Sequence, residues 1–194
     1  MTKLTKKENS IIKKVHDFVK QESVGQFEDD VFENHIMNVK NFAIKLSEHY
    51  KANKFAIILA CYLHDLTIIQ EKTNVDHEIK ASKFARKYLT DEFSLDAKLI
   101  NLICDCILCH RGSKDRKRKS IEAKIVACAD AMDHIDRSLA MFYRISKREN
   151  FRESVNWLNA KLDRGWKKLE LPEAKQLVKK KFLAMKLMLT DKSK

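Results

Sequence analysis

Glycine and proline are almost absent from this chain of 194 residues. Gly25, Gly112 and Gly165 are the three glycines, and Pro172 is the one proline. A fold of many short strands would need more of these turn-forming residues, whereas helices joined by short polar loops would not. Apolar residues make up 44% of the chain, enough to bury a core in one domain. The sequence therefore predicts an all-α fold.

Apolar residues recur at helical spacing in successive segments. The expected helices cover residues 4–20, 30–46, 54–66, 77–89, 95–110 and 121–145, and two more follow Asn150. Asp30 and Glu33 resemble a capping box, Ser120 can cap the helix that follows it, and Pro172 suits a first helical turn. Gly112 is placed to end the helix before it. Helices therefore account for most of the chain.

Three of these helices are apolar enough to be buried, yet each carries a polar side chain able to bind a metal. His64 and Asp65 end KFAIILACYLHDL, His110 ends LDAKLINLICDCILCH, and Asp130 lies within IEAKIVACADAM. Burying an ionised carboxylate costs several kcal/mol unless a cation or hydrogen-bond donors compensate. A divalent metal bound by histidine nitrogen and carboxylate oxygen would satisfy all of these groups. The sequence indicates one or two such ions without distinguishing Mn, Fe, Co, Ni, Mg and Zn.

The order of these residues resembles the signature of a known family. His35, then His64 with Asp65, then Asp130, each on a separate helix, resemble the H…HD…D pattern of the HD superfamily of metal-dependent phosphohydrolases. The resemblance spans roughly residues 31–145. It implies a compact helical bundle of the HD type in residues 1–148, with residues 149–194 as a C-terminal helical extension packed on the same domain.

Two more histidines extend the resemblance. His77, which opens HEIKASKFA, resembles the family's histidine after the HD pair, and His110 resembles the histidine that closes the next helix. The metal ligands that the resemblance implies are His35, His64, Asp65, His77, His110 and Asp130. His64 and Asp65 would form the catalytic pair, with Asp65 bridging two ions. Paired ions would activate water for attack on phosphorus, so no side chain would act as nucleophile.

The chain also departs from the family in two places. The HD pair is followed by LTII, whereas many relatives place glycine and then a basic residue close behind it, so that substrate contact is not transferred. His110 is followed by Arg-Gly-Ser rather than Gly-Tyr-Pro, which argues against the cyclic dinucleotide phosphodiesterases. The resemblance therefore predicts the chemistry without naming the substrate.

The charge of the chain favours an anionic partner. The net charge is +12, and six basic residues lie between Arg111 and Lys119. Arg111, Lys114 and Arg116 follow the proposed ligand His110 closely enough to bind a phosphate, although a solvated loop explains them equally well. The expected substrate is a small phosphorylated compound, most simply a nucleotide, and nucleic acid remains a less favoured partner.

Several other residues have simpler explanations than metal or ligand binding. Cys104, Cys106 and Cys109 point in different directions around one helix and cannot converge on zinc, so they are expected to be buried thiols. The pair His16–Asp17 is assigned to the surface, and Trp157 and Trp166 to packing. Asp133 would either orient a metal ligand or pair with Arg137.

These observations lead to a predicted function with two rivals. The chain is expected to be a metal-dependent phosphomonoesterase, phosphodiesterase or nucleotide pyrophosphohydrolase in the cytoplasm, since no apolar run reaches membrane-spanning length and MTKLTKKENS lacks the core of a signal peptide. A homodimer through the C-terminal extension stays open. The first rival is a catalytically weak HD-fold module that senses metal or nucleotide or binds nucleic acid. The second is a helical interaction protein without metal.

Overall fold

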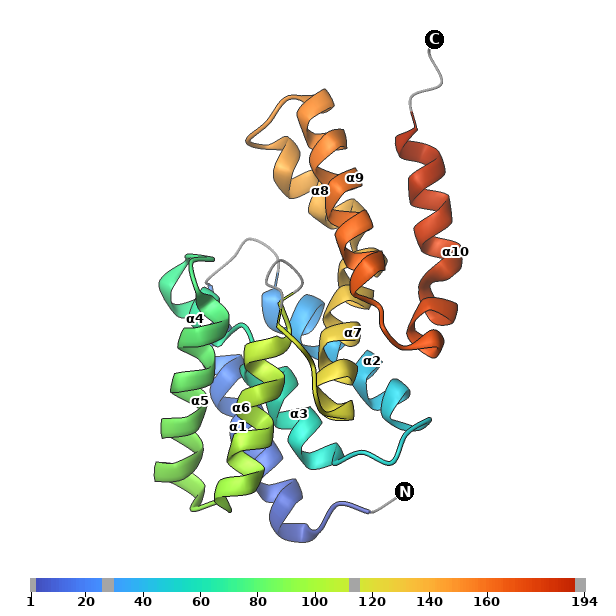
Figure 1. Cartoon of the computed structure of the whole chain (residues 1–194). Coiled ribbons are helices and arrows are strands. Elements are labelled where there is room, and N and C mark those ends of the chain that lie inside the picture. Colours follow the sequence, from blue (N-terminus) through green and yellow to red (C-terminus); the bar gives the residue numbers. More distant parts are fainter. Residues whose placement is uncertain (1–2, 26–29, 112–115, 191–194) are drawn as a thin grey trace.

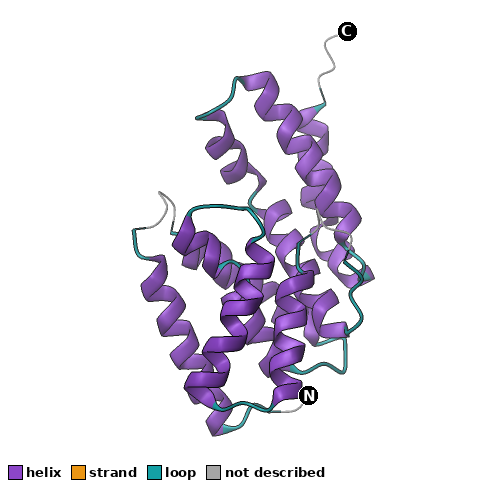
Figure 2. Ribbon diagram, turned by 60° about the vertical axis from the view of Figure 1, so that its left-hand side comes forward, coloured by secondary structure: helices purple, strands orange, loops and turns teal. Residues whose placement is uncertain are grey.

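The computed structural model of the chain describes residues 3–25, 30–111 and 116–190, and these residues form helices and loops with no β-strand (Figures 1 and 2). The helices are α1 (Lys6–Ser23), η1 (Phe32–Ile36), α2 (Met37–Ser47), α3 (Lys54–Leu63), α4 (Leu66–Glu71), α5 (His77–Phe93), α6 (Ala97–Cys109), α7 (Ile121–Asp136), α8 (Ser138–Ser146), α9 (Phe151–Lys168) and α10 (Pro172–Leu189). The predicted all-α fold is confirmed.

Side-chain caps define where several of these helices begin. The side chain of Ser120 accepts a hydrogen bond from the Ala123 amide, and Pro172 occupies the first turn of α10, both as predicted. Asp30 accepts from the Glu33 amide, which is half of the expected capping box. Gly112, expected to end α6, lies outside the described residues. The helix α6 itself ends at Cys109.

The core is organised around α3. Every residue of α3 from Phe55 to Leu63 is buried, so this helix is surrounded rather than amphipathic. It packs against α1, α2, α6 and α7, while α5 covers the outer side of α6 (Figure 1). Because α3 is fixed on all sides, the residues at its C-terminal end are held firmly in the centre of the fold.

The helices α8, α9 and α10, called the C-terminal helices below, lie at one end of the molecule (Figure 1). α9 and α10 both pack on α7, and α8 packs on α9. Trp166 of α9 stacks on Phe182 of α10 with ring centroids 4.3 Å apart, in agreement with its predicted packing role. The boundary predicted at residues 148 and 149 stays a prediction.

Three local features differ from the expected helices. The single helix predicted over residues 121–145 is wrong, because the chain turns at Arg137 (φ −101°, ψ 24°) between α7 and α8. Leu139, which follows this turn, is 64% exposed. The LTII segment after Asp65 forms the short helix α4, and the first turn around His35 is a π-helix, η1. Turns of this kind are frequent at functional sites.

Two simpler expectations concern cysteines and membranes. Cys61, Cys104, Cys106, Cys109 and Cys128 are all buried as free thiols, each within a helix. Within the part of the chain that the structure describes, none of the helices combines the length and the hydropathy needed to cross a bilayer.

Candidate metal centre

The six predicted ligands come from five places in the chain and meet at the centre of the fold. His64 is the C-cap of α3 and Asp65 begins α4, so the buried end of α3 delivers both side chains to one point. His35 lies in the π turn η1 and His77 opens α5. The remaining two are His110 at the C-cap of α6 and Asp130 inside α7. These six side chains are called the metal cluster below.

One half of the metal cluster gathers around His35. Its Nε2 lies 3.2 Å from Asp65 Oδ2, 3.3 Å from His64 Nε2 and 3.9 Å from Asp130 Oδ1. His64 Nε2 is 3.6 Å from the same Asp65 oxygen. Potential ligands here form two groups of three that share His35: one with His64 and Asp65, the other with Asp130 and with His134, which was not among the predicted ligands.

The other half gathers around the second oxygen of the same carboxylate. Asp65 Oδ1 lies 3.5 Å from His77 Nε2 and 3.5 Å from His110 Nε2, and these two nitrogens are 3.1 Å apart. Asp65 thus presents one oxygen to each half of the cluster. This arrangement suits the bridging position that the sequence resemblance implied for it.

Hydrogen bonds on the far side of each ring orient the imidazoles. Nδ1 of His64 lies 2.8 Å from the Cys61 carbonyl oxygen, and Nδ1 of His110 lies 2.6 Å from that of Ile107. A carbonyl oxygen only accepts, so in both rings Nδ1 carries the proton and Nε2 keeps its lone pair. His77 Nδ1 faces the Asn74 carbonyl oxygen in the same way at 3.3 Å.

Burial reinforces the neutral state of His64 and His77. It lowers the pKa of His64 to about 4 and also lowers the pKa of His77. Burial acts in the same direction on His35, but hydrogen bonds to Asp133 and Asp65 outweigh it and raise the pKa of His35 to about 10. The carboxylates of Asp133 and Asp65 therefore favour a positive charge on the His35 ring when no metal is bound.

The two carboxylates of the cluster stay ionised despite their burial. Burial by itself would raise the pKa of Asp65, but His64 and the other imidazoles around it hold that pKa well below the usual range. Burial would likewise raise the pKa of Asp130, but the nearby His134 and Lys168 hold it well below the usual range. The centre therefore combines anionic oxygens with the uncharged imidazoles of His64 and His77.

The donor set fits a divalent cation. Lone pairs of His77 Nε2 and His110 Nε2 face each other and the buried oxygen Oδ1 of Asp65, which has no hydrogen-bond partner. Such a contact is repulsive unless a cation lies between the groups. Donor atoms bound to one ion at about 2.1 Å lie about 3.0–3.4 Å apart, close to the spacings in the cluster. Neutral imidazole and carboxylate are ligands that Zn, Mn, Fe, Co and Ni accept.

Two further residues hold the ligands in place. Asp133 Oδ2 accepts a 2.6 Å hydrogen bond from His35 Nδ1 and lies 3.9 Å from Arg137 Nη1, so both predicted interactions of Asp133 are present. Lys168, from the end of α9, makes a buried ion pair with Asp130 Oδ2. The sequence analysis missed Lys168, because a lysine in the last turn of a helix is ordinarily read as a solvated charge that offsets the helix dipole.

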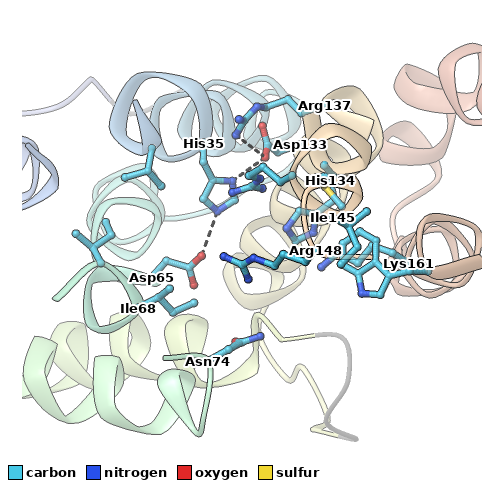
Figure 3. A pocket seen from close by; sticks show the side chains of 15 residues that line it. His35, Asp65, Ile68, Asn74, Asp133, His134, Arg137, Ile145, Arg148 and Lys161 are labelled. Atoms are coloured by element: carbon cyan, nitrogen blue, oxygen red, sulfur yellow. Dashed lines mark hydrogen bonds and ion pairs between the residues drawn. The ribbon is translucent and has the colours of Figure 1, made fainter. Parts of the chain in front are cut away.

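Two adjoining pockets of about 400 and 550 Å³ open onto the metal cluster. Both are lined by Asp65, Ile68, Asn74, His134, Trp157 and Lys161. The smaller pocket, drawn in Figure 3, also has His35 and Asp133 in its wall, whereas the larger one has His77, His110 and Asp130. The pockets thus reach opposite halves of the cluster and meet at Asp65.

Basic side chains surround these pockets. The smaller pocket is lined by Arg137, Arg144, Arg148 and Lys161, and the larger one by Arg111, Lys161, Arg164 and Lys168. Apart from Arg111, they follow α7 in the chain, on the C-terminal helices or in the turns that connect them. Such a surface attracts anions, and phosphate in particular.

Two of the residues predicted to bind phosphate after His110 lie near a buried carboxylate instead. Arg111 Nη1 lies 3.1 Å from Oε2 of the buried Glu78, and Arg116 Nη2 lies 3.8 Å from its Oε1. Arg111 lines the larger pocket, but Arg116 does not. Lys114 lies outside the described residues. The role predicted for these three residues stays a prediction.

Two more sequence expectations can be compared with the structure. Trp157, assigned to packing, lines both pockets and is 37% exposed, so the structure places it differently from Trp166. Cys104, Cys106 and Cys109 belong to none of the groups of potential metal ligands found among the described residues. His16 Nδ1 and Asp17 Oδ1 lie 2.9 Å apart on α1; Asp17 is exposed as expected, whereas His16 is half-buried against the rings of Phe32 and Tyr62.

Comparisons with known proteins agree with this fold. The family model described as HD domain matches residues 32–135. A crystal structure of an HD-superfamily hydrolase from Bacillus thuringiensis is similar over 94% of this chain and 94% of that one, with 23% identity and a TM-score of 0.67. A predicted HD superfamily hydrolase from an uncultured Thermotogales bacterium is 18% identical, covers 91% and 88% of the two chains, and has a TM-score of 0.63. No curated protein sequence matches the chain.

Proposed function

The chain belongs to the HD domain family, and we propose that it is a metal-dependent phosphohydrolase acting on a nucleotide or another small phosphorylated metabolite. Membership of the family and the fold shared with HD-superfamily hydrolases support a metal-dependent hydrolase in general terms. The substrate class is the further step, and it rests on the side chains that line the pockets.

The observation that carries this proposal is the inward orientation of the imidazoles. His64, His77 and His110 each turn Nδ1 towards a backbone carbonyl oxygen and Nε2 towards the carboxylate of Asp65. We propose that the metal cluster binds one or two divalent ions, with Asp65 between them. Bound ions would activate water for attack on phosphorus and offset negative charge on the phosphoryl oxygens.

The other residues of the site would prepare it for this reaction. Asp133 holds the His35 ring so that Nε2 faces the cluster, and Lys168 restrains one oxygen of Asp130. The basic residues around the two pockets would bind the phosphate groups of the substrate, and Trp157 offers a partly exposed aromatic face for a base. A small phosphorylated compound with an aromatic ring suits both features.

A substrate screen tests the proposal. The purified protein would be stripped of metal, reloaded separately with Mn, Ni, Co, Zn and Mg, and incubated with a panel of nucleotides and phosphorylated metabolites. We expect release of phosphate or pyrophosphate from at least one of them, and inhibition by a chelator that reverses when metal is restored. Metal binding without hydrolysis of any compound would instead favour the module that only senses metal or nucleotide.

The nucleic-acid alternative requires a separate measurement. Titration of a fluorescent single-stranded RNA and a DNA duplex at two salt concentrations would reveal binding that weakens steeply with salt, as phosphate-backbone contacts do. We expect only weak binding by the metal-loaded protein, because the cations closest to the metal cluster line two small pockets rather than an extended groove. Tight binding combined with absent hydrolysis would contradict the enzymatic proposal.

A further inference from the structure

The two walls of the pockets differ in polarity above the metal cluster. On the α4 side, Ile68 lines both pockets and Ile69 lines the smaller one, so the residues that follow the His64–Asp65 pair place no charge there. On the opposite side, Lys161 of α9 lines both pockets. A phosphate bound at the cluster would therefore find its cations on the C-terminal helices.

Lys161 lies where it can serve both halves of the site. It lines both pockets together with Asp65, the residue shared by the two halves of the metal cluster. Its side chain makes no hydrogen bond or ion pair with any residue in the described part of the chain, and it is only partly exposed. A lysine ammonium group held in such a place without an anionic partner is costly, and an anionic ligand removes that cost.

Arg148 approaches the same space from the connection between α8 and α9. Figure 3 shows its side chain reaching into the smaller pocket, towards the side on which Asp65 lies. Within the described residues its guanidinium group also has no hydrogen bond or ion pair. This distinguishes Arg148 from Lys168 and Arg111, whose charges are already paired with Asp130 and Glu78.

We propose that Lys161 and Arg148 bind the phosphoryl oxygens of the substrate above the metal cluster, which makes the C-terminal helices part of the active site. The inference rests on the proposed function and adds the residues that recognise phosphate. Metal ions and these two side chains would hold the phosphoryl group from opposite sides. Charge-assisted hydrogen bonds of this kind contribute about 1.5–3 kcal/mol each.

The matched control lies on the same helix. Lys167 is exposed on α9, lines neither pocket and forms no ion pair with a described residue. Lys161→Met and Lys167→Met therefore remove the same charge from one helix, but only the first removes it from the site. Lys161→Arg keeps a cation there, and Arg148→Met tests the second side chain.

The experiment combines binding with hydrolysis. Calorimetric titration of inorganic phosphate and of pyrophosphate into the Mn-loaded protein should give a Kd about tenfold to a hundredfold weaker for Lys161→Met than for wild type, converted from the hydrogen-bond energies above. Arg148→Met should weaken binding in the same direction, Lys161→Arg should retain most of it, and Lys167→Met should bind as wild type does. Metal content should be unchanged in all four, and Tm should fall in none of them.

Hydrolysis of 4-nitrophenyl phosphate and of bis(4-nitrophenyl) phosphate is measured in parallel. If the wild-type protein hydrolyses at least one ester, kcat/KM should fall in Lys161→Met and stay unchanged in Lys167→Met. If it hydrolyses neither ester nor any compound of the substrate screen, the proposed function fails, while the phosphate titrations still test Lys161. Wild-type affinity in Lys161→Met, absence of phosphate binding by wild type, or loss of metal from the variant would each overturn the inference.

Discussion

The two walls of the pockets carry their charge in different ways. The wall formed by residues of the HD domain match holds buried carboxylates and imidazoles that lie against one another, within a core that surrounds α3, and one of them, Asp130, also pairs with Lys168. The wall formed by the C-terminal helices holds lysines and arginines, three of which (Arg148, Lys161 and Arg164) form no hydrogen bond or ion pair with a described residue. The carboxylates and imidazoles of the first wall would be stabilised by a bound cation. The lysines and arginines of the second wall would be stabilised by a bound anion. A phosphate ester bound to metal satisfies both requirements.

The largest effect is expected where the first wall loses its bridging carboxylate. Asp65→Asn should lower phosphohydrolase activity by about 10³-fold or more and reduce the bound metal, because one carboxylate serves both halves of the cluster. The chain contains its own control in the second His-Asp pair, and Asp17→Asn should change neither quantity. Steady-state assays and metal analysis by mass spectrometry provide the measurements. Equal activity in the two variants would remove Asp65 from the mechanism.

Acid should destabilise the first wall when metal is absent. The pKa of His64 is about 4 in the folded chain and near 6.5 when unfolded, so below pH 6.5 the unfolded chain binds a proton that the folded chain does not. As the pH falls from 6.5 towards 4, this one histidine should remove about 3 kcal/mol from the free energy of unfolding.

Urea unfolding of the chelated protein at pH 7 and pH 4.5 measures that loss. It should be smaller in His64→Asn, while His49→Asn, at an exposed histidine, should lose as much stability as wild type. The same loss in all three proteins would show that His64 is not held neutral by burial.

A smaller effect is expected from a residue that supports the cluster without belonging to it. Asp133→Asn leaves the His35 ring without its charged acceptor, and loss of such a partner weakens metal affinity or activity by about tenfold to a hundredfold. Asp136→Asn on the same helix breaks only an ion pair with Lys181 and should leave metal affinity unchanged. Competition with a chromogenic chelator measures the affinity. An unchanged metal Kd in Asp133→Asn would mean that the ring is oriented by other contacts.

The smallest effect is expected at the aromatic part of the second wall, Trp157. Trp157→Ala should raise KM for a nucleotide about twofold to tenfold, the range of one aromatic stacking contact, with little change in Tm. Trp166→Ala removes the ring stacked on Phe182 and should instead lower stability by about 2–3 kcal/mol while KM stays the same. A raised KM in Trp166→Ala and an unchanged KM in Trp157→Ala would show that the nucleotide base does not stack on Trp157.

The first wall could be predicted from the sequence because its ionisable residues lie within or directly after strongly apolar helical segments. Asp130 between two alanines of a buried helix, and His64 with Asp65 after nine apolar residues, require compensation that only a tertiary contact can supply. The separate helices of the fold followed from apolar spacing and from caps such as Ser120. The order of the histidines and aspartates then indicated the family.

The second wall could not be predicted in this way. The second wall comes from charged segments in which any lysine or arginine is ordinarily read as solvated. Only the packing of α9 on α7 brings Lys161 and Lys168 to the pockets. The turn at Arg137 has no glycine or proline to mark it, so the 121–145 segment was expected to continue as one helix. The π turn at His35 is likewise invisible in the apolar spacing.

The most direct test of the metal cluster is anomalous diffraction from crystals of the protein soaked in Mn²⁺. The account predicts a strong peak bounded by Nε2 of His35 and His64 and by the carboxylate of Asp65, at about 2.0–2.3 Å from its ligand atoms. A second peak is expected between Asp65, His77 and His110. Well-ordered side chains with no peak between them, at a Mn²⁺ concentration that supports activity, would contradict it.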